Sequence, residues 1–359
     1  MPQSPQGLHR FPALDGLRGA AALVVLAFHL LQQRDLTALP LAGLAVDFFY
    51  TLSGFVIAFA YEQKLRSGRM RLPAFLWVRV ERLYPLLLLG TLMGIAPAML
   101  AVAFKGTITY HQVASSSVLA LLLLPSYVFP QWDTAYPLNM ASWSLTFELV
   151  ANAIYAIMAP SLTLRRLVQL TFCSAILLII VAYVNNGVAG GNNQDNFVYG
   201  FGRVLYPFFV GVLLFRLRLS WKIDSRTGIL LTLALVGLLL APVHDSGLTS
   251  VIYVLVIFPV VVGIGANVQP SAASAKIFRL FGNLSYPIYI LQGPILRLGE
   301  EMLRHWQLTR PEFYLFTSIE GLVVLVFSYV AFVAYDVPLR SYLTLRYKQK
   351  LAIGVIAGP

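Results

Sequence analysis

The chain carries one apolar run after another, each about 18–25 residues long, which is the length that crosses the ~30 Å hydrocarbon core of a bilayer as a helix. Of its 359 residues, 58% are hydrophobic and 11% are charged, whereas soluble chains carry roughly 25% charged residues. Runs such as LALVGLLL and IEGLVVLVFSYVAFVAY lack the alternation of barrel strands. The sequence therefore predicts an all-α, polytopic membrane protein, because helices satisfy their backbone hydrogen bonds within each span.

We expect about ten transmembrane helices in one integral-membrane domain over residues 1–359, with a core over 11–340 and cytoplasmic tails at 1–10 and 341–359. The predicted spans are 11–31, 43–61, 76–103, 140–159, 167–184, 198–215, 227–242, 249–267, 280–298 and 313–335. An eleventh apolar run, Val118 to Phe129, is shorter and contains Pro125.

The basic residues decide whether this eleventh run crosses the membrane. If it does not cross, nineteen Lys and Arg residues fall on one side, and only Arg34, Lys105, Arg304 and Arg310 fall on the other. Such a bias places both termini in the cytoplasm, and a crossing at 118–129 would remove it. We therefore predict a re-entrant or interfacial segment at 118–129 on the outer side, covered by protein or by a water-filled cavity.

The same loop positions account for the net charge of +11 without nucleic-acid binding. Cys173 is the only cysteine, so an intrachain disulfide is excluded. Asp15 and Arg18 interrupt the first apolar run, which argues against a cleavable signal peptide. We expect neither a metal nor a permanently bound cofactor.

The first span places three ionisable side chains, Asp15, Arg18 and His29, on one face. At about 100° per residue, eleven steps return to within ~20° of the starting direction, and the rise puts His29 roughly 16 Å beyond Arg18. Charges within a span are costly and usually functional. An imidazole past mid-membrane can take a proton at neutral pH, which suits a general base. The alternative is a histidine hydrogen-bonded in a helix interface.

The second span carries Asp47, Thr51 and Gly54 on one stripe. Asp47 either orients a histidine or binds a donor group, or it is a carboxylate in water at the outer boundary. Ser53 and Gly54 either line a cavity or only permit close helix packing. The fourth span adds a polar stripe at helical spacing, formed by Ser144, Glu148, Asn152 and Tyr155.

Three arginines lie within or beside the spans. Arg79 and Arg82 share one helical face beyond the basic loop, where two guanidiniums can grip phosphates or anchor lipid headgroups. Arg203 either lines the same cavity or pairs with Glu148 or Asp47 as a buried structural charge.

Five motifs in order resemble the membrane acyltransferase 3 family over residues 13 to about 340. They are LDGLRGAAALVVLAFHL with its Arg18-to-His29 spacing, VDFFYTLSGF, RVERLYP with Arg79 and Arg82, WSLTFELVANAIY with Glu148, and FGNLSYPIYILQGP. The chain departs from the family at Gln292, where many members have His, so we assign Gln292 no acid–base role. Asp336-Val-Pro338 stands where the family often has Glu-x-Pro. We expect no hydrolase domain of the kind that follows the membrane domain in some members.

The resemblance implies transfer of an acyl group, usually acetyl, from cytoplasmic acyl-coenzyme A to a hydroxyl of a cell-surface or exported carbohydrate or a related acceptor. It implies that His29 deprotonates this hydroxyl or carries the acyl group itself. Arg18 then stabilises the oxyanion or binds a donor phosphate, and Asp47 and Glu148 orient the base. Arg79 and Arg82 bind the donor.

We expect the protein in a bacterial inner membrane. The rival hypothesis is a proton-coupled transporter, since intramembrane carboxylates and histidines also form proton relays. The two related halves that many transporters show are absent from the sequence. A receptor or scaffold, the third class, would not need His29.

Overall fold

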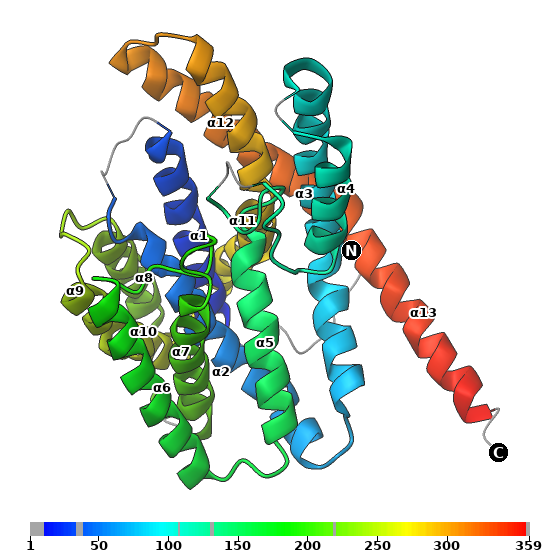
Figure 1. The fold of residues 1–359 in the computed structure, drawn as a ribbon. Coiled ribbons are helices and arrows are strands. Elements are labelled where there is room, and N and C mark those ends of the chain that lie inside the picture. Colours follow the sequence, from blue (N-terminus) through cyan, green and yellow to red (C-terminus); the bar gives the residue numbers. More distant parts are fainter. Residues whose placement is uncertain (1–10, 34–38, 107, 130–132, 218–219, 357–359) are drawn as a thin grey trace.

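The computed structural model describes residues 11–33, 39–106, 108–129, 133–217 and 220–356. Within these ranges the secondary structure is helical (Figure 1). The helices are α1 (Pro12–Gln32), η1 (Ala42–Leu44), α2 (Ala45–Arg66), α3 (Leu72–Lys105), α4 (Tyr110–Leu121), α5 (Ser142–Met158), α6 (Leu164–Val184), α7 (Tyr199–Leu217), α8 (Ser225–Leu239), α9 (Gly247–Ile252), η2 (Tyr253–Ile257), α10 (Phe258–Gly265), α11 (Ala272–His305), α12 (Arg310–Ala331), η3 (Phe332–Asp336) and α13 (Val337–Ile356).

Each of the ten predicted spans coincides with one of these helices or with a continuous run of them, so the all-α, polytopic fold is confirmed. Among the described residues, seven helical runs are long and apolar enough to cross a membrane. The other three predicted spans correspond to α5 and α8, which have 17 and 15 residues, and to the longer but more polar α11. The bundle is therefore built from spans of unequal length.

The run at 118–129 forms no spanning helix, as predicted. Its first residues complete α4, which has 12 residues, and the chain then continues without helix to Phe129. The segment 133–141 follows and is held between two long helices. The carbonyl of Leu138 faces Gly94 of α3, and Arg297 of α11 donates a hydrogen bond to the Pro137 carbonyl. These contacts hold the segment 133–141 against α3 and α11, whereas Val118, Leu122 and Tyr127 of the predicted re-entrant run are exposed.

The last span does not end near residue 335 as the sequence predicts. The helix passes through the π-helical turn η3 and continues as α13 to Ile356, standing away from the bundle in Figure 1. Pro338 lies at the second position of α13, directly after this π-helical turn.

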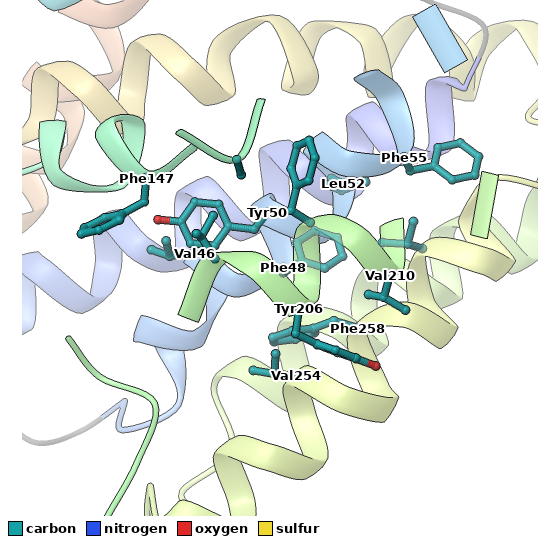
Figure 2. Packing of buried hydrophobic residues seen from close by; sticks show 14 of the residues in the cluster. Val46, Phe48, Tyr50, Leu52, Phe55, Phe147, Tyr206, Val210, Val254 and Phe258 are labelled. Atoms are coloured by element: carbon teal, nitrogen blue, oxygen red, sulfur yellow. The ribbon is translucent and has the colours of Figure 1, made fainter. Parts of the chain in front are cut away.

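The largest hydrophobic cluster is centred on α2, α5, α7 and α10. Figure 2 shows Phe48 beside Phe258, and their ring centroids are 5.6 Å apart in an edge-to-face arrangement. Two glycines bring α2 and α7 together, because a Cβ at Gly54 would collide with the Phe208 carbonyl, and one at Gly211 with the Thr51 carbonyl. Gly54 therefore permits close packing, one of its two predicted roles.

Helix α1 packs in parallel along α11. Gly16 faces Phe278 and Gly19 faces Phe281, so both pairs are 262 positions apart. Leu26 and Ile288, with the same separation, share a hydrophobic cluster further along. This constant register places His29 level with Leu291 of α11.

Candidate active site

Arg18 links α1 to α11 at the start of the site. Its Nη2 donates hydrogen bonds to Asp15 Oδ1 at 3.1 Å and to the carbonyl oxygen of Gly282 at 2.7 Å. The approach of the helices depends on Gly282, since a Cβ there would meet the Asp15 side chain. Asp15 and Arg18 thus share one face, as their spacing predicts, and the guanidinium reaches across to α11.

Glu148 joins three helices. Its Oε1 accepts hydrogen bonds from Arg79 Nη2 of α3 at 2.7 Å and from Ser53 Oγ of α2 at 2.6 Å. Arg79 is 4% exposed, so this ion pair is shielded from solvent. The structure brings together three residues that were predicted from separate motifs.

Arg82 lies one turn beyond Arg79 and is half-buried. It is close enough to Arg79 and Arg18 for their charges to act on it, yet no described residue forms a hydrogen bond or ion pair with its guanidinium. The structure therefore places three arginines from α1 and α3 near two carboxylates, those of Asp15 and Glu148. This arginine cluster, formed by Arg18, Arg79 and Arg82, has a positive excess that suits a polyanionic ligand.

The carboxylate of Asp47 forms an ion pair of its own. Its two carboxylate oxygens accept from Nε and Nη2 of Arg203 at 2.9 and 2.7 Å. Arg203 also donates to the Gly43 carbonyl at 3.0 Å and lies over the Trp143 ring at 5.0 Å. Both partners are buried. Of the predicted alternatives, the structure shows Arg203 paired with Asp47 as a buried charge.

His29 lies three residues before the end of α1 and is half-buried. Its Nδ1 is 3.3 Å from Gln32 Oε1. The carboxylates expected to orient it are bonded to arginines instead, Asp47 to Arg203 and Glu148 to Arg79. The hydrogen-bond partner that the structure gives His29 is thus the amide of Gln32, one turn along α1.

The polar stripe of α5 is buried and faces three different partners. Ser144 Oγ is 2.8 Å from the Tyr289 hydroxyl, Glu148 meets Arg79, and Tyr155 donates to Glu62 Oε2 at 3.1 Å. Asn152, fully buried, has no partner for either amide atom among the described residues. The predicted stripe therefore runs through the interior with one amide left to a ligand or to water.

Sequence reasoning missed a third buried ion pair. Glu62 of α2 accepts from Arg216 Nε of α7 at 2.9 Å, and Arg216 also donates to the Leu162 carbonyl at 2.5 Å. Both residues sit near the ends of predicted spans, where topology alone accounts for charge. The sequence contains one indication of this ion pair, because an acidic residue, Glu62, stands within a strongly basic stretch.

Comparison with known proteins identifies the family of the chain. The acyltransferase domain of the acyltransferase 3 family matches residues 11–335. The chain belongs to this family. It is a membrane-bound acyltransferase, and the transporter and scaffold alternatives do not apply.

Two curated proteins are similar over part of the chain. "Protein 2 in picA locus" of Rhizobium radiobacter is 36% identical over 194 residues, which cover 51% of this chain and 98% of that protein. "Acyltransferase MdmB" of Streptomyces mycarofaciens is 30% identical over 195 residues, 51% of this chain and 48% of that protein. The chain thus spans about half the length of the second relative. No solved structure matches.

Proposed function

We propose that this acyltransferase moves an acyl group, in the first instance acetyl, from cytoplasmic acyl-coenzyme A to a hydroxyl of a cell-surface or exported carbohydrate or related acceptor. The observation that carries the donor assignment is the arginine cluster. Arg82 has no described partner, although a buried or half-buried guanidinium is expected to be paired. The phosphates of coenzyme A supply the missing negative charge.

The proposed membrane orientation supports this donor. Nineteen Lys and Arg residues fall on the side of the α2–α3 loop, which is the cytoplasmic side under the positive-inside rule. The start of α3 carries Arg79 and Arg82 inward from that loop. We propose a single membrane domain in a bacterial inner membrane with both termini in the cytoplasm. The donor then meets the arginine cluster from the compartment where acyl-coenzyme A is made.

The proposed reaction uses His29 in one of two ways. As a general base, its ring takes the proton of the acceptor hydroxyl while that oxygen bonds to the thioester carbonyl carbon; the carbon–sulfur bond breaks, and coenzyme A leaves as a thiolate that takes up a proton. As a nucleophile, a ring nitrogen first bonds to the thioester carbon and displaces the coenzyme A thiolate; the acceptor oxygen then bonds to the same carbon, the carbon–nitrogen bond breaks, and the imidazole takes up the hydroxyl proton. Arg18 either stabilises the oxyanion of the tetrahedral intermediate or binds a donor phosphate.

The experiment uses the full chain in lipid nanodiscs. We expect acetyl-coenzyme A to bind, and we expect surface glycans of cells that produce the protein to gain acyl groups that mass analysis detects against cells without it. In the same assay Arg82→Ala should bind acetyl-coenzyme A more weakly, and Arg71→Ala is its matched control, because Arg71 is an exposed arginine next to α3. Absence of donor binding, or glycans without added acyl groups in a well-expressing strain, would refute the proposed reaction.

A further inference from the structure

Glu320 of α12 is a buried carboxylate that the proposed reaction does not use. It is 7% exposed, and its Oε2 accepts a hydrogen bond at 2.7 Å from a neutral group, the Gln33 side-chain amide at the end of α1. Its other oxygen, Oε1, has no hydrogen-bond partner among the described residues, and the same holds for Gln33 Oε1. Carboxylates within a span are rare and usually functional, so this pair is a candidate binding site.

The packing of α11 makes room for this carboxylate. A Cβ at Gly299 would collide with Glu320 Oε1, so the carboxylate fills the space that a side chain at position 299 would take. The buried carboxylates of Asp47 and Glu148 are paired with arginines, whereas Glu320 forms no ion pair within the part of the chain that the structure describes. A carboxylate can accept about four hydrogen bonds. Glu320 therefore keeps capacity for further donors.

The Gln33–Glu320 pair lies close to His29 along α1. A Cβ at Gly321 of α12 would lie 3.0 Å from Leu30, the residue directly after His29, and the neighbouring Glu320 contacts Gln33. His29 and Gln33 are four residues apart, so they lie on the same face of α1, about 6 Å apart along its axis. The pair therefore lies about one turn beyond His29, on its outer side under the proposed orientation.

We propose that Gln33 and Glu320 bind the acyl acceptor through hydroxyls that neighbour the acylated one. The oxygens with unused capacity accept hydrogen bonds, so the groups that complement them are donors. A molecule that presents one hydroxyl to His29 from the outer side places its neighbouring hydroxyls toward this pair, so the acyl acceptor carries several hydroxyls, as a sugar ring does. This assignment rests on the proposed acyl transfer and adds the residues that recognise the acyl acceptor.

The test measures coenzyme A release by the purified full chain in nanodiscs with acetyl-coenzyme A and two probes. Methyl glucopyranoside and cyclohexylmethanol each carry a primary hydroxyl on a six-membered ring, but only the sugar has ring hydroxyls beside it. We expect the wild type to acylate methyl glucopyranoside with at least tenfold higher kcat/KM. Equal or better use of cyclohexylmethanol would overturn the proposal.

Two variants weaken the pair and preserve side-chain size. Glu320→Gln removes the charge and replaces one accepting oxygen by a donor, so KM for methyl glucopyranoside should rise about tenfold, as expected when a hydrogen bond to a charged group is lost. Gln33→Met removes one accepting oxygen and should raise this KM about fivefold. Neither change should alter acetyl-coenzyme A affinity or kcat/KM for cyclohexylmethanol, because neither quantity depends on ring hydroxyls.

Thr317→Val is the matched control. Thr317 is also buried and lies one turn before Glu320 on α12, but its hydroxyl already donates to the Phe313 carbonyl. This variant should leave KM for both probes unchanged. If Glu320 only holds α12 against α1, its glutamine variant should instead lower the use of both probes to the same extent.

The outcomes separate this inference from the proposed function. Unchanged KM for methyl glucopyranoside in both variants, or an equal loss with the two probes, removes Gln33 and Glu320 from the acceptor site while donor binding and acyl transfer stand. If the donor binds and neither probe is acylated, this inference and the proposed acceptor class are both wrong. If the donor does not bind to the wild type at all, the proposed function itself fails.

Discussion

Arg79 donates a hydrogen bond to Glu148 at 2.7 Å, whereas Arg82, one turn further along α3, has no described partner. The two arginines of one motif therefore have different roles. Arg79 ties α3 to α5 through a carboxylate that also holds Ser53 of α2. Under the proposed function, Arg82 keeps its donors for the coenzyme A phosphates, and Arg79 positions the helix that carries it.

This difference predicts unequal effects of alanine substitutions. Arg82→Ala should weaken acetyl-coenzyme A binding by about 1.5–3 kcal/mol, the value of a hydrogen bond to a charged group, which is roughly tenfold to a hundredfold in Kd. Its thermal stability should stay near that of the wild type. Arg79→Ala should lower stability as well, because it leaves Glu148 unpaired in the interior. Titration calorimetry and thermal unfolding in detergent measure the two quantities.

Arg71, which is exposed, provides a control for the loss of a positive charge alone. Arg71→Ala removes a positive charge from the same loop without touching the cluster, and donor affinity should be preserved. Identical donor affinity in Arg82→Ala and the wild type would exclude Arg82 from the donor site.

Asp47 is predicted to stabilise the fold through Arg203. Asp47→Ala should destabilise the protein by about 3–5 kcal/mol, because a buried arginine loses its bidentate partner. Asp133→Ala is the control, since Asp133 is exposed in the segment before α5. The double variant Asp47→Leu with Arg203→Leu should recover most of the lost stability.

Activity of that double variant separates structure from chemistry. If acyl transfer returns with stability, Asp47 serves the packing of α2 on α7. A stable but inactive double variant would show that Asp47 takes part in the reaction, as the sequence predicts.

Much of the architecture could be predicted because it depends on local properties of the sequence. Run length and loop charge determine where helices lie and which run does not cross. The spacing of Asp15 and Arg18 likewise predicts a shared face, and the structure confirms it. The α5 stripe follows from helical periodicity alone.

The partners of the buried charges could not be predicted in the same way. Asp47 pairs with Arg203, 156 positions away, because Gly54 and Gly211 bring α2 and α7 close together. The sequence shows that both charges need a partner but not which helix supplies it. Glu62 was missed for a related reason, since its burial depends on Tyr155 and Arg216 from α5 and α7.

The membrane orientation is a separate prediction. Alkaline phosphatase fused after the last residue should be inactive, because that reporter folds only outside the cytoplasm, and a green fluorescent protein at the same position should fluoresce. The reason is that nineteen Lys and Arg residues fall on the predicted cytoplasmic side of the membrane and four on the other side. A phosphatase fused after Gly106, at the end of α3, is the control and should be active. An active phosphatase at the C-terminus would reverse the orientation.

Asn152 is predicted to lower the stability of the protein and to contribute to donor binding. Asn152→Leu removes a buried amide that lacks partners and so should raise the unfolding temperature. The same change should weaken acetyl-coenzyme A binding, because the unpaired nitrogen and oxygen together match an amide, and the pantetheine arm of the donor carries amides. Asn152 lies one turn from Glu148, the carboxylate that accepts a hydrogen bond from Arg79 of the arginine cluster. Unchanged donor affinity in the stabilised variant would leave Asn152 outside the donor path.

His29 provides the decisive test of the reaction. His29→Ala should abolish acyl transfer while acetyl-coenzyme A affinity stays unchanged. The reason is that Arg18, the member of the arginine cluster on α1, lies eleven residues earlier in the sequence. His29→Gln keeps polarity but cannot take a proton at neutral pH, so its rate should fall by roughly 10²–10⁴-fold if His29 is a general base, and further if it carries the acyl group.

His244→Gln is the matched control, since His244 is exposed between α8 and α9. It should retain wild-type activity. Mass analysis of protein quenched during turnover separates the two roles of His29, because only the nucleophilic route leaves an acyl group on a peptide containing residue 29. If His29 merely fills a helix interface beside Gln32, the glutamine variant should work almost normally. A well-folded His29→Gln protein that acylates its acceptor at the wild-type rate would therefore reject both the site and the reaction proposed for it.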